Sequence, residues 1–124
     1  MINPSVSGLP RGARLQQSSE FNAIFEQNSL RINAAEFLIL ARENDFTFGR
    51  LGMIISKRTT PTSVKRNLFK RLTREAFRLS EFNNIPLDII VLGRPRVNKM
   101  TRREVQNDLL AHFQSLIEQW TKKQ

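Results

Sequence analysis

The sequence predicts a single α+β domain, an α/β sandwich in which helices cover both faces of a small β-sheet at least in part. Three observations support this fold class. The chain has 124 residues, enough for one domain with one hydrophobic core. Apolar residues recur at helical spacing in three segments, and short apolar runs typical of strands lie between them. The expected order is helix, two or three strands, helix, strand, helix.

The sequence of the N-terminal part predicts a tail followed by a first helix. Residues 1–13 contain two prolines and two glycines without periodicity, which indicates a flexible tail before a single domain of residues 14–124. Serines that can cap a helix then precede Phe21, Ile24 and Phe25, which share one helical face. We therefore expect a short helix over residues 19–28.

Two strands are expected next. The run 37–41 is apolar throughout, which is typical of a strand covered on both faces. A turn at Asn44 and Asp45 separates it from a second apolar run at 51–56. Their proximity in the chain favours an antiparallel hairpin.

The second helix is expected over residues 64–79, after hydroxyl side chains that can cap it. On a helical wheel, its apolar residues gather on one arc and are expected to face the core. They are Val64, Leu68, Phe69, Leu72, Ala76 and Leu79. The opposite arc is almost purely cationic and holds Arg66, Asn67, Lys70, Arg71, Arg74 and Arg78. Phe77 falls within that cationic arc.

The last elements are a strand and a long helix. Residues 87–92 form an apolar run that ends at Gly93. Thr101 and Glu104 have the spacing of a capping box, and amphipathic residues follow, so a helix is expected over 102–121.

The positive charge is concentrated in one part of the chain. The formal net charge is +9. Residues 49–78 hold nine basic side chains and one acidic side chain, whereas residues 1–48 hold four and five. A dense cationic block suits a polyanion, with nucleic acid as the first candidate. No run approaches the roughly 18 apolar residues of a membrane helix, and no signal peptide or cysteine suggests export. A cytoplasmic location without a membrane partner is therefore expected.

The sequence offers little for catalysis by the protein itself. There is no cysteine, and the only histidine, His112, lies beside an apolar stripe of the last helix, where a structural role is expected. No pair of acids stands out as general acid and base, and the glycines form no nucleotide-binding loop. We assign no catalytic residue, no metal ligand and no small-molecule ligand to this chain.

One motif resembles a known family. Ser56-Lys57-Arg58 and then Arg66-Asn67-Leu68-Phe69-Lys70-Arg71-Leu72-Thr73-Arg74-Glu75 are similar to the signature of the bacterial ribonuclease P protein subunit. The resemblance extends over nearly the whole chain. Leu68 departs from the pattern, since it stands where the family has an arginine, and we expect it to pack against the core.

The resemblance implies a fold and a role. The fold is a ribosomal-protein-like sandwich with a left-handed βαβ crossover through the basic helix. The role is that of a non-catalytic subunit, which binds a catalytic RNA and the 5′ leader of precursor tRNA. The RNA cleaves the leader with Mg²⁺, held mainly by the RNA and the substrate. The implied contacts to the catalytic RNA are Lys57, Arg58, Arg66, Asn67, Lys70, Arg71, Arg74 and Arg78. The implied leader cleft involves Arg14, Phe21, Phe25, Leu38 and Leu40.

Two other interpretations remain open at this point. A ribosomal or other nucleic-acid-binding protein could use the same helix without any part in cleavage. A stand-alone nuclease would instead cleave RNA without a partner RNA and would depend on a carboxylate.

Overall fold

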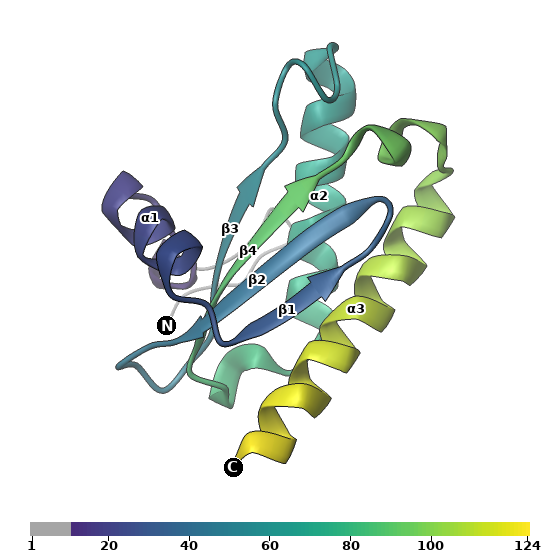
Figure 1. Cartoon of the computed structure of the whole chain (residues 1–124). Helices are drawn as coiled ribbons and strands as arrows, with labels where there is room; N and C mark the ends of the chain where they lie inside the picture. Colours follow the sequence, from purple (N-terminus) through teal and green to yellow (C-terminus); the bar gives the residue numbers. More distant parts are fainter. Residues whose placement is uncertain (1–10) are drawn as a thin grey trace.

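The fold is a four-stranded sheet with helices on both faces (Figure 1). The computed structural model describes residues 11–124, and the first ten residues of the expected tail lie outside the described part of the chain. Three α-helices, four strands and three 3-10 turns are present in that part. The helices are α1 (Ser18–Glu26), α2 (Ser63–Leu79) and α3 (Arg102–Lys123). The strands are β1 (Leu30–Asn33), β2 (Phe37–Glu43), β3 (Arg50–Ile54) and β4 (Leu87–Gly93). The 3-10 turns are η1 (Arg11–Ala13), η2 (Phe82–Asn84) and η3 (Pro95–Lys99). The predicted α+β class and order are confirmed.

The sheet order is β1-β2-β4-β3, which corrects the expected hairpin. β4 lies between β2 and β3 and pairs antiparallel with β2 and parallel with β3. The antiparallel hairpin is instead β1 with β2. β2 and β4 carry apolar side chains on both faces, and such strands are most stable in the centre of a sheet. β3 and β4 are joined through α2 in a βαβ crossover, as the family resemblance implied.

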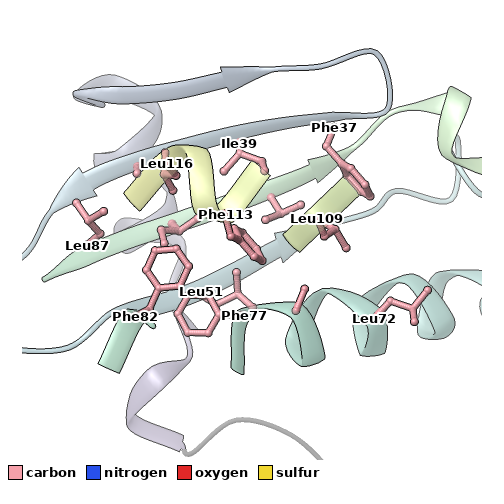
Figure 2. Close-up of a cluster of buried hydrophobic side chains, with 14 of the residues drawn as sticks. Phe37, Ile39, Leu51, Leu72, Phe77, Phe82, Leu87, Leu109, Phe113 and Leu116 are labelled. Carbon is pink, nitrogen blue, oxygen red and sulfur yellow. The ribbon is translucent and has the colours of Figure 1, made fainter. Parts of the chain in front are cut away.

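The two faces of the sheet are covered unequally. α2 and α3 pack on one face, and alternate residues such as Phe37, Ile39 and Ile89 meet them there (Figure 2). On the other face, α1 alone covers the sheet, with Ile24 packed among Leu40 and Ile90. Because one short helix cannot cover a whole sheet face, Leu38 and other residues beyond α1 are only half-buried.

The buried face of α2 is rotated from the expected arc by about 80°. Val64 and Leu79 are 77% and 56% exposed, so their expected core positions are wrong. Phe77 is instead buried, stacked on Phe82 with 4.7 Å between ring centroids and edge-on to Phe113 (Figure 2). Burying this aromatic ring removes more apolar surface from water than burying Val64 or Leu79 would. The next residue, Arg78, is exposed.

Leu68 lies on the flank of the buried face and is only half-buried. We expect Leu68→Ala to lower the free energy of unfolding by about 1 kcal/mol, below the roughly 2–5 kcal/mol of a fully buried leucine. Leu72→Ala, at a buried position of the same helix, is the matched comparison and should fall in that higher range. Urea denaturation of both variants measures the difference. Equal losses would place Leu68 in the core.

Candidate RNA-binding surface

The cationic surface of α2 lies along the edge of its buried face. Arg71 and Arg78 are exposed, as are Lys57 and Arg58 in the preceding loop. Lys70 is half-buried. Asn67 is exposed between these cations. We call this set, together with Arg66 and Arg74, the cationic surface. The structure therefore brings all the predicted contacts to the catalytic RNA onto one helix and the loop before it.

Arg66 differs from the other cations because it holds the loop before α2. Its Nη1 donates to the carbonyl oxygens of Thr60 and Pro61, at 2.8 and 2.7 Å. The hydroxyl of Thr62 caps the same helix end by accepting from the Lys65 N–H. Arg66 thus has a structural role that its sequence position did not reveal.

A second basic segment joins the cationic surface through Asn98. The Asn98 amide donates to the Thr59 carbonyl at 2.7 Å and accepts from the Thr60 hydroxyl at 3.1 Å. These bonds hold η3 against the loop of Lys57 and Arg58. The exposed Arg96 and Lys99 of η3 therefore extend the cationic surface. The basic residues of this segment are visible in the sequence, but no local pattern shows that the segment folds back onto the other loop.

Arg14 and Arg74 approach each other at the free edge of β3. Arg14 forms an isolated parallel bridge with Leu51, which brings it beside α2. Burial lowers the pKa of Arg74, and the charges of Arg14 and Arg71 lower it further. The Nε of Arg74 is buried without a hydrogen-bond partner in the part of the chain that the structure describes. A buried donor amid like charges is costly unless an acceptor binds to it, and a phosphate oxygen is such an acceptor.

These cations line one pocket together with an aromatic residue. The pocket has a volume of about 360 Å³ and is lined by Arg14, Phe21, Gly52, Lys70 and Arg74, among others. It therefore joins the cationic surface of α2 to the predicted leader cleft beside α1. An RNA strand could place a phosphate here and a base against the adjoining apolar surface.

The predicted cleft residues differ in exposure. Ile24 is the core residue of α1, whereas Phe21 is half-buried and Phe25 is 40% exposed. Leu38 is half-buried on the same sheet face. Leu40 is 4% exposed, so it supports α1 from below and offers no surface to a ligand. Of the predicted cleft residues, Phe21, Phe25 and Leu38 therefore offer apolar surface to a ligand.

A network of charged side chains fixes α1 over the sheet. Arg50 in β3 donates two hydrogen bonds to Asp88 in β4, at 2.8 and 2.7 Å, and one to Glu20 in α1, at 2.8 Å. Burial raises the pKa of Glu20, but the N–H groups of Gln17 and Gln16 and the Arg50 guanidinium outweigh it, so the pKa lies below its ordinary value. The network occupies Arg50 and leaves it unavailable to RNA.

Comparison with known proteins shows the family of the chain. Residues 9–117 match the family model described as Ribonuclease P. The chain belongs to the ribonuclease P protein family. The ribonuclease P protein component of Marinomonas sp. is 37% identical over 100 residues, which cover 81% of this chain and 76% of that protein. The component from Marinobacter nauticus is 38% identical over 101 residues, 81% of this chain and 75% of that protein.

Solved structures of ribonuclease P proteins have the same fold. The protein from Staphylococcus aureus superposes with a TM-score of 0.75 at 27% identity, covering 85% of this chain and 94% of that one. The protein from Thermotoga maritima gives a TM-score of 0.67 at 25% identity, covering 81% and 94%. Members of the ribonuclease P protein family are part of a holoenzyme, an endoribonuclease that matures the 5′ ends of tRNA. Among residues 11–124, no helix is long and apolar enough to cross a membrane.

Proposed function

We propose that this ribonuclease P protein uses two adjoining surfaces for two RNAs. The cationic surface of α2 binds the catalytic RNA, and the cleft of Phe21, Phe25 and Leu38 binds the single-stranded leader of precursor tRNA. The observation that carries the proposal is the pocket of Arg14, Lys70 and Arg74, which makes the two surfaces continuous. We further propose that the holoenzyme acts in the cytoplasm.

The chemistry of the two surfaces matches these two ligands. Arginine fits phosphate oxygens with paired N–H groups, which suits a folded RNA that presents many phosphates. An exposed aromatic ring offers a stacking platform, which only unpaired bases can use. The leader is unpaired, and mature tRNA lacks it. The protein therefore contributes affinity for the substrate over the product.

The proposed surfaces supply no ligands for the Mg²⁺ that cleavage is expected to need. Mg²⁺ prefers oxygen ligands, above all carboxylates and phosphates. The cationic surface and the cleft residues are basic, amide or apolar side chains. We therefore propose that phosphates of the two RNAs hold Mg²⁺, and that this chain neutralises the remaining phosphate charge around them.

The proposed division of labour is tested in the reconstituted holoenzyme. Phe25→Ala should weaken binding of precursor tRNA about 5- to 150-fold, because a stacked base contributes roughly 1–3 kcal/mol. Binding of mature tRNA should not change. Leu79→Ala removes a side chain that is 56% exposed at the end of α2, and it is the matched control. Equal losses for both tRNA forms in the Phe25 variant would contradict a leader cleft.

A reconstitution assay separates this function from a stand-alone nuclease. The protein alone should leave precursor tRNA uncut, and cleavage should require an added bacterial ribonuclease P RNA. Cleavage by the protein alone, lost on substitution of a carboxylate, would overturn the proposal.

Gly52 provides a second test of the cleft, since the Phe21 ring lies directly on its backbone. A Cβ at position 52 would stand 2.6 Å from two atoms of that ring. Gly52→Ala should therefore displace the Phe21 ring and reduce the binding preference for precursor over mature tRNA, while the protein stays folded. Gly12→Ala is the control, because its Cβ would meet nothing within 4 Å. Filter-binding assays with both tRNA forms measure the effect, and an unchanged preference in the folded Gly52 variant would exclude Phe21 from leader binding.

A further inference from the structure

A separate cluster of side chains lies between α3 and the turn that joins β1 to β2. Asp108 and His112 are four residues apart on α3, so they share one face of the helix. Glu36 reaches them from the turn. One ligand atom from each of the three lies within 4.8 Å of the others, and His112 Nε2 is 3.2 Å from Glu36 Oε2. None of these residues belongs to the two proposed RNA surfaces.

We propose that Glu36, Asp108 and His112 form a binding site for one divalent transition-metal ion of the Zn²⁺ class. The site holds two carboxylates and one imidazole, a donor set suited to Zn²⁺ and its neighbours, whereas Mg²⁺ and Ca²⁺ take oxygen ligands. Tetrahedral Zn²⁺ with bonds of about 2.0–2.2 Å keeps neighbouring ligand atoms about 3.3–3.6 Å apart. The 3.2 Å separation of the imidazole nitrogen and the carboxylate oxygen is close to that spacing.

Charge and burial also favour a cation. Glu36 is only 7% exposed, and among residues 11–124 no lysine or arginine forms a salt bridge with it. Asp108 brings a second carboxylate within 4.8 Å of the ligand atoms of Glu36 and His112. Two carboxylates in contact need a proton or a metal ion between them. In a protein of net charge +9, this is a local concentration of negative charge.

Hydrogen bonds from Arg94 fix the turn that carries Glu36. The backbone carbonyl of Glu36 accepts from the Arg94 N–H at 2.9 Å. The Arg94 guanidinium in turn donates to Asn33 Oδ1 and to the Ala34 carbonyl, at 2.7 and 2.8 Å. These bonds fix the turn, so little ordering is required when an ion binds. Asp108 and His112 are half-buried, so solvent reaches the site and can supply a water ligand.

The test uses the free protein without RNA, after removal of residual metal by a chelator. Zn²⁺ is titrated by calorimetry and by NMR of the imidazole, which is unambiguous because the chain has one histidine. We expect one Zn²⁺ per chain, a shift of the His112 ring signals at that stoichiometry, and a higher midpoint of thermal unfolding. Co²⁺ should give the visible absorption bands of a four-coordinate site.

Variants assign the ligands. His112→Gln and Asp108→Asn should each weaken Zn²⁺ binding at least about 10-fold. Glu118→Gln removes an exposed carboxylate from the same helix and should leave the affinity unchanged within about twofold. Imidazole signals that stay in place at excess Zn²⁺ would overturn the proposal, and would mean that a proton alone joins the two carboxylates. This titration is done on the wild-type protein without RNA. Its outcome therefore depends neither on the folding of a variant nor on RNA binding.

Discussion

Replacing Lys70, Arg71 and Arg74 together with alanine should weaken binding of the catalytic RNA about 100-fold near physiological salt. All three side chains lie on the cationic surface, and each is expected to contact a phosphate. Loss of three such contacts should also lower the slope of log affinity against log salt by about 2–3, since each phosphate contact contributes roughly 0.7–0.9. A salt titration of binding to the RNA subunit measures both effects.

The structure decides which cations to replace. Arg66 is left intact because it bonds the carbonyls of Thr60 and Pro61, and its removal would disturb the start of α2. Arg74 has a pKa lowered by burial and by the charges of Arg14 and Arg71. Its replacement relieves that repulsion, so we expect the triple variant to fold. Far-ultraviolet circular dichroism checks this before binding is measured.

A charge-matched control separates local contacts from net charge. Arg102, Arg103 and Lys122 are exposed on α3, outside the cationic surface. Replacing these three with alanine removes the same charge and should change affinity no more than about threefold. If both triple variants lose affinity equally, the RNA responds to the total charge of the protein, and α2 is not its binding surface.

The helices and the central strands could be predicted from the sequence because their signals are local. The capping box of Thr101 and Glu104 is present at the start of α3, and the fully apolar run of β2 is buried on both faces as expected. The strand order could not be predicted in the same way. β2 pairs with β4, so Leu40 lies opposite Ile90, fifty residues later in the chain. No local sequence pattern indicates such a long-range contact. β1 was not assigned as a strand, since four residues carry too short an alternation.

The charge of the cationic surface could be predicted from the sequence, but the way its residues are arranged in space could be predicted only in part. The cationic arc of α2 is visible on a helical wheel, because charge depends on sequence alone. The orientation of that helix depends on its partners, and the stacking of Phe77 on Phe82 turns it away from the expected arc. Leu40 illustrates the same limit, since only the packing of α1 over it shows that it is buried. The meeting of Arg14 with Arg74 likewise depends on how the chain follows the edge of β3.

Asp88→Ala should lower the free energy of unfolding by about 3–5 kcal/mol, the largest effect on stability that we expect from a change near the cleft. Asp88 is 8% exposed and accepts two hydrogen bonds from Arg50 and a third from Asn44 Nδ2, at 2.8 Å. The Arg50 side chain is only 14% exposed. Removing the carboxylate leaves the guanidinium buried beside Glu20 alone, and an unpaired buried charge is far more costly than a missing surface pair.

Two further variants show that the unpaired charge is the cause. Glu20→Gln should cost about 1 kcal/mol or less, because Asp88 still pairs with Arg50 and Glu20 is partly exposed. The double variant Arg50→Met with Asp88→Leu should recover most of the loss, since apolar residues of similar volume replace the buried pair. Urea denaturation provides the three values. A loss below about 1 kcal/mol in Asp88→Ala would mean that water reaches Arg50 and that the network is not buried.

The same network predicts how stability depends on pH. Glu20 has a pKa in the folded protein below its value in the unfolded chain. Its contribution to stability is therefore complete above the unfolded pKa and is lost as the pH falls through the lower, folded pKa. Glu20→Gln should remove this part of the acid sensitivity, whereas Glu118→Gln, at an exposed position of α3, should retain it. Denaturation midpoints measured between about pH 7 and pH 3 test the prediction. An identical pH profile for wild type and Glu20→Gln would show that Arg50 does not hold α1 to the sheet through this carboxylate.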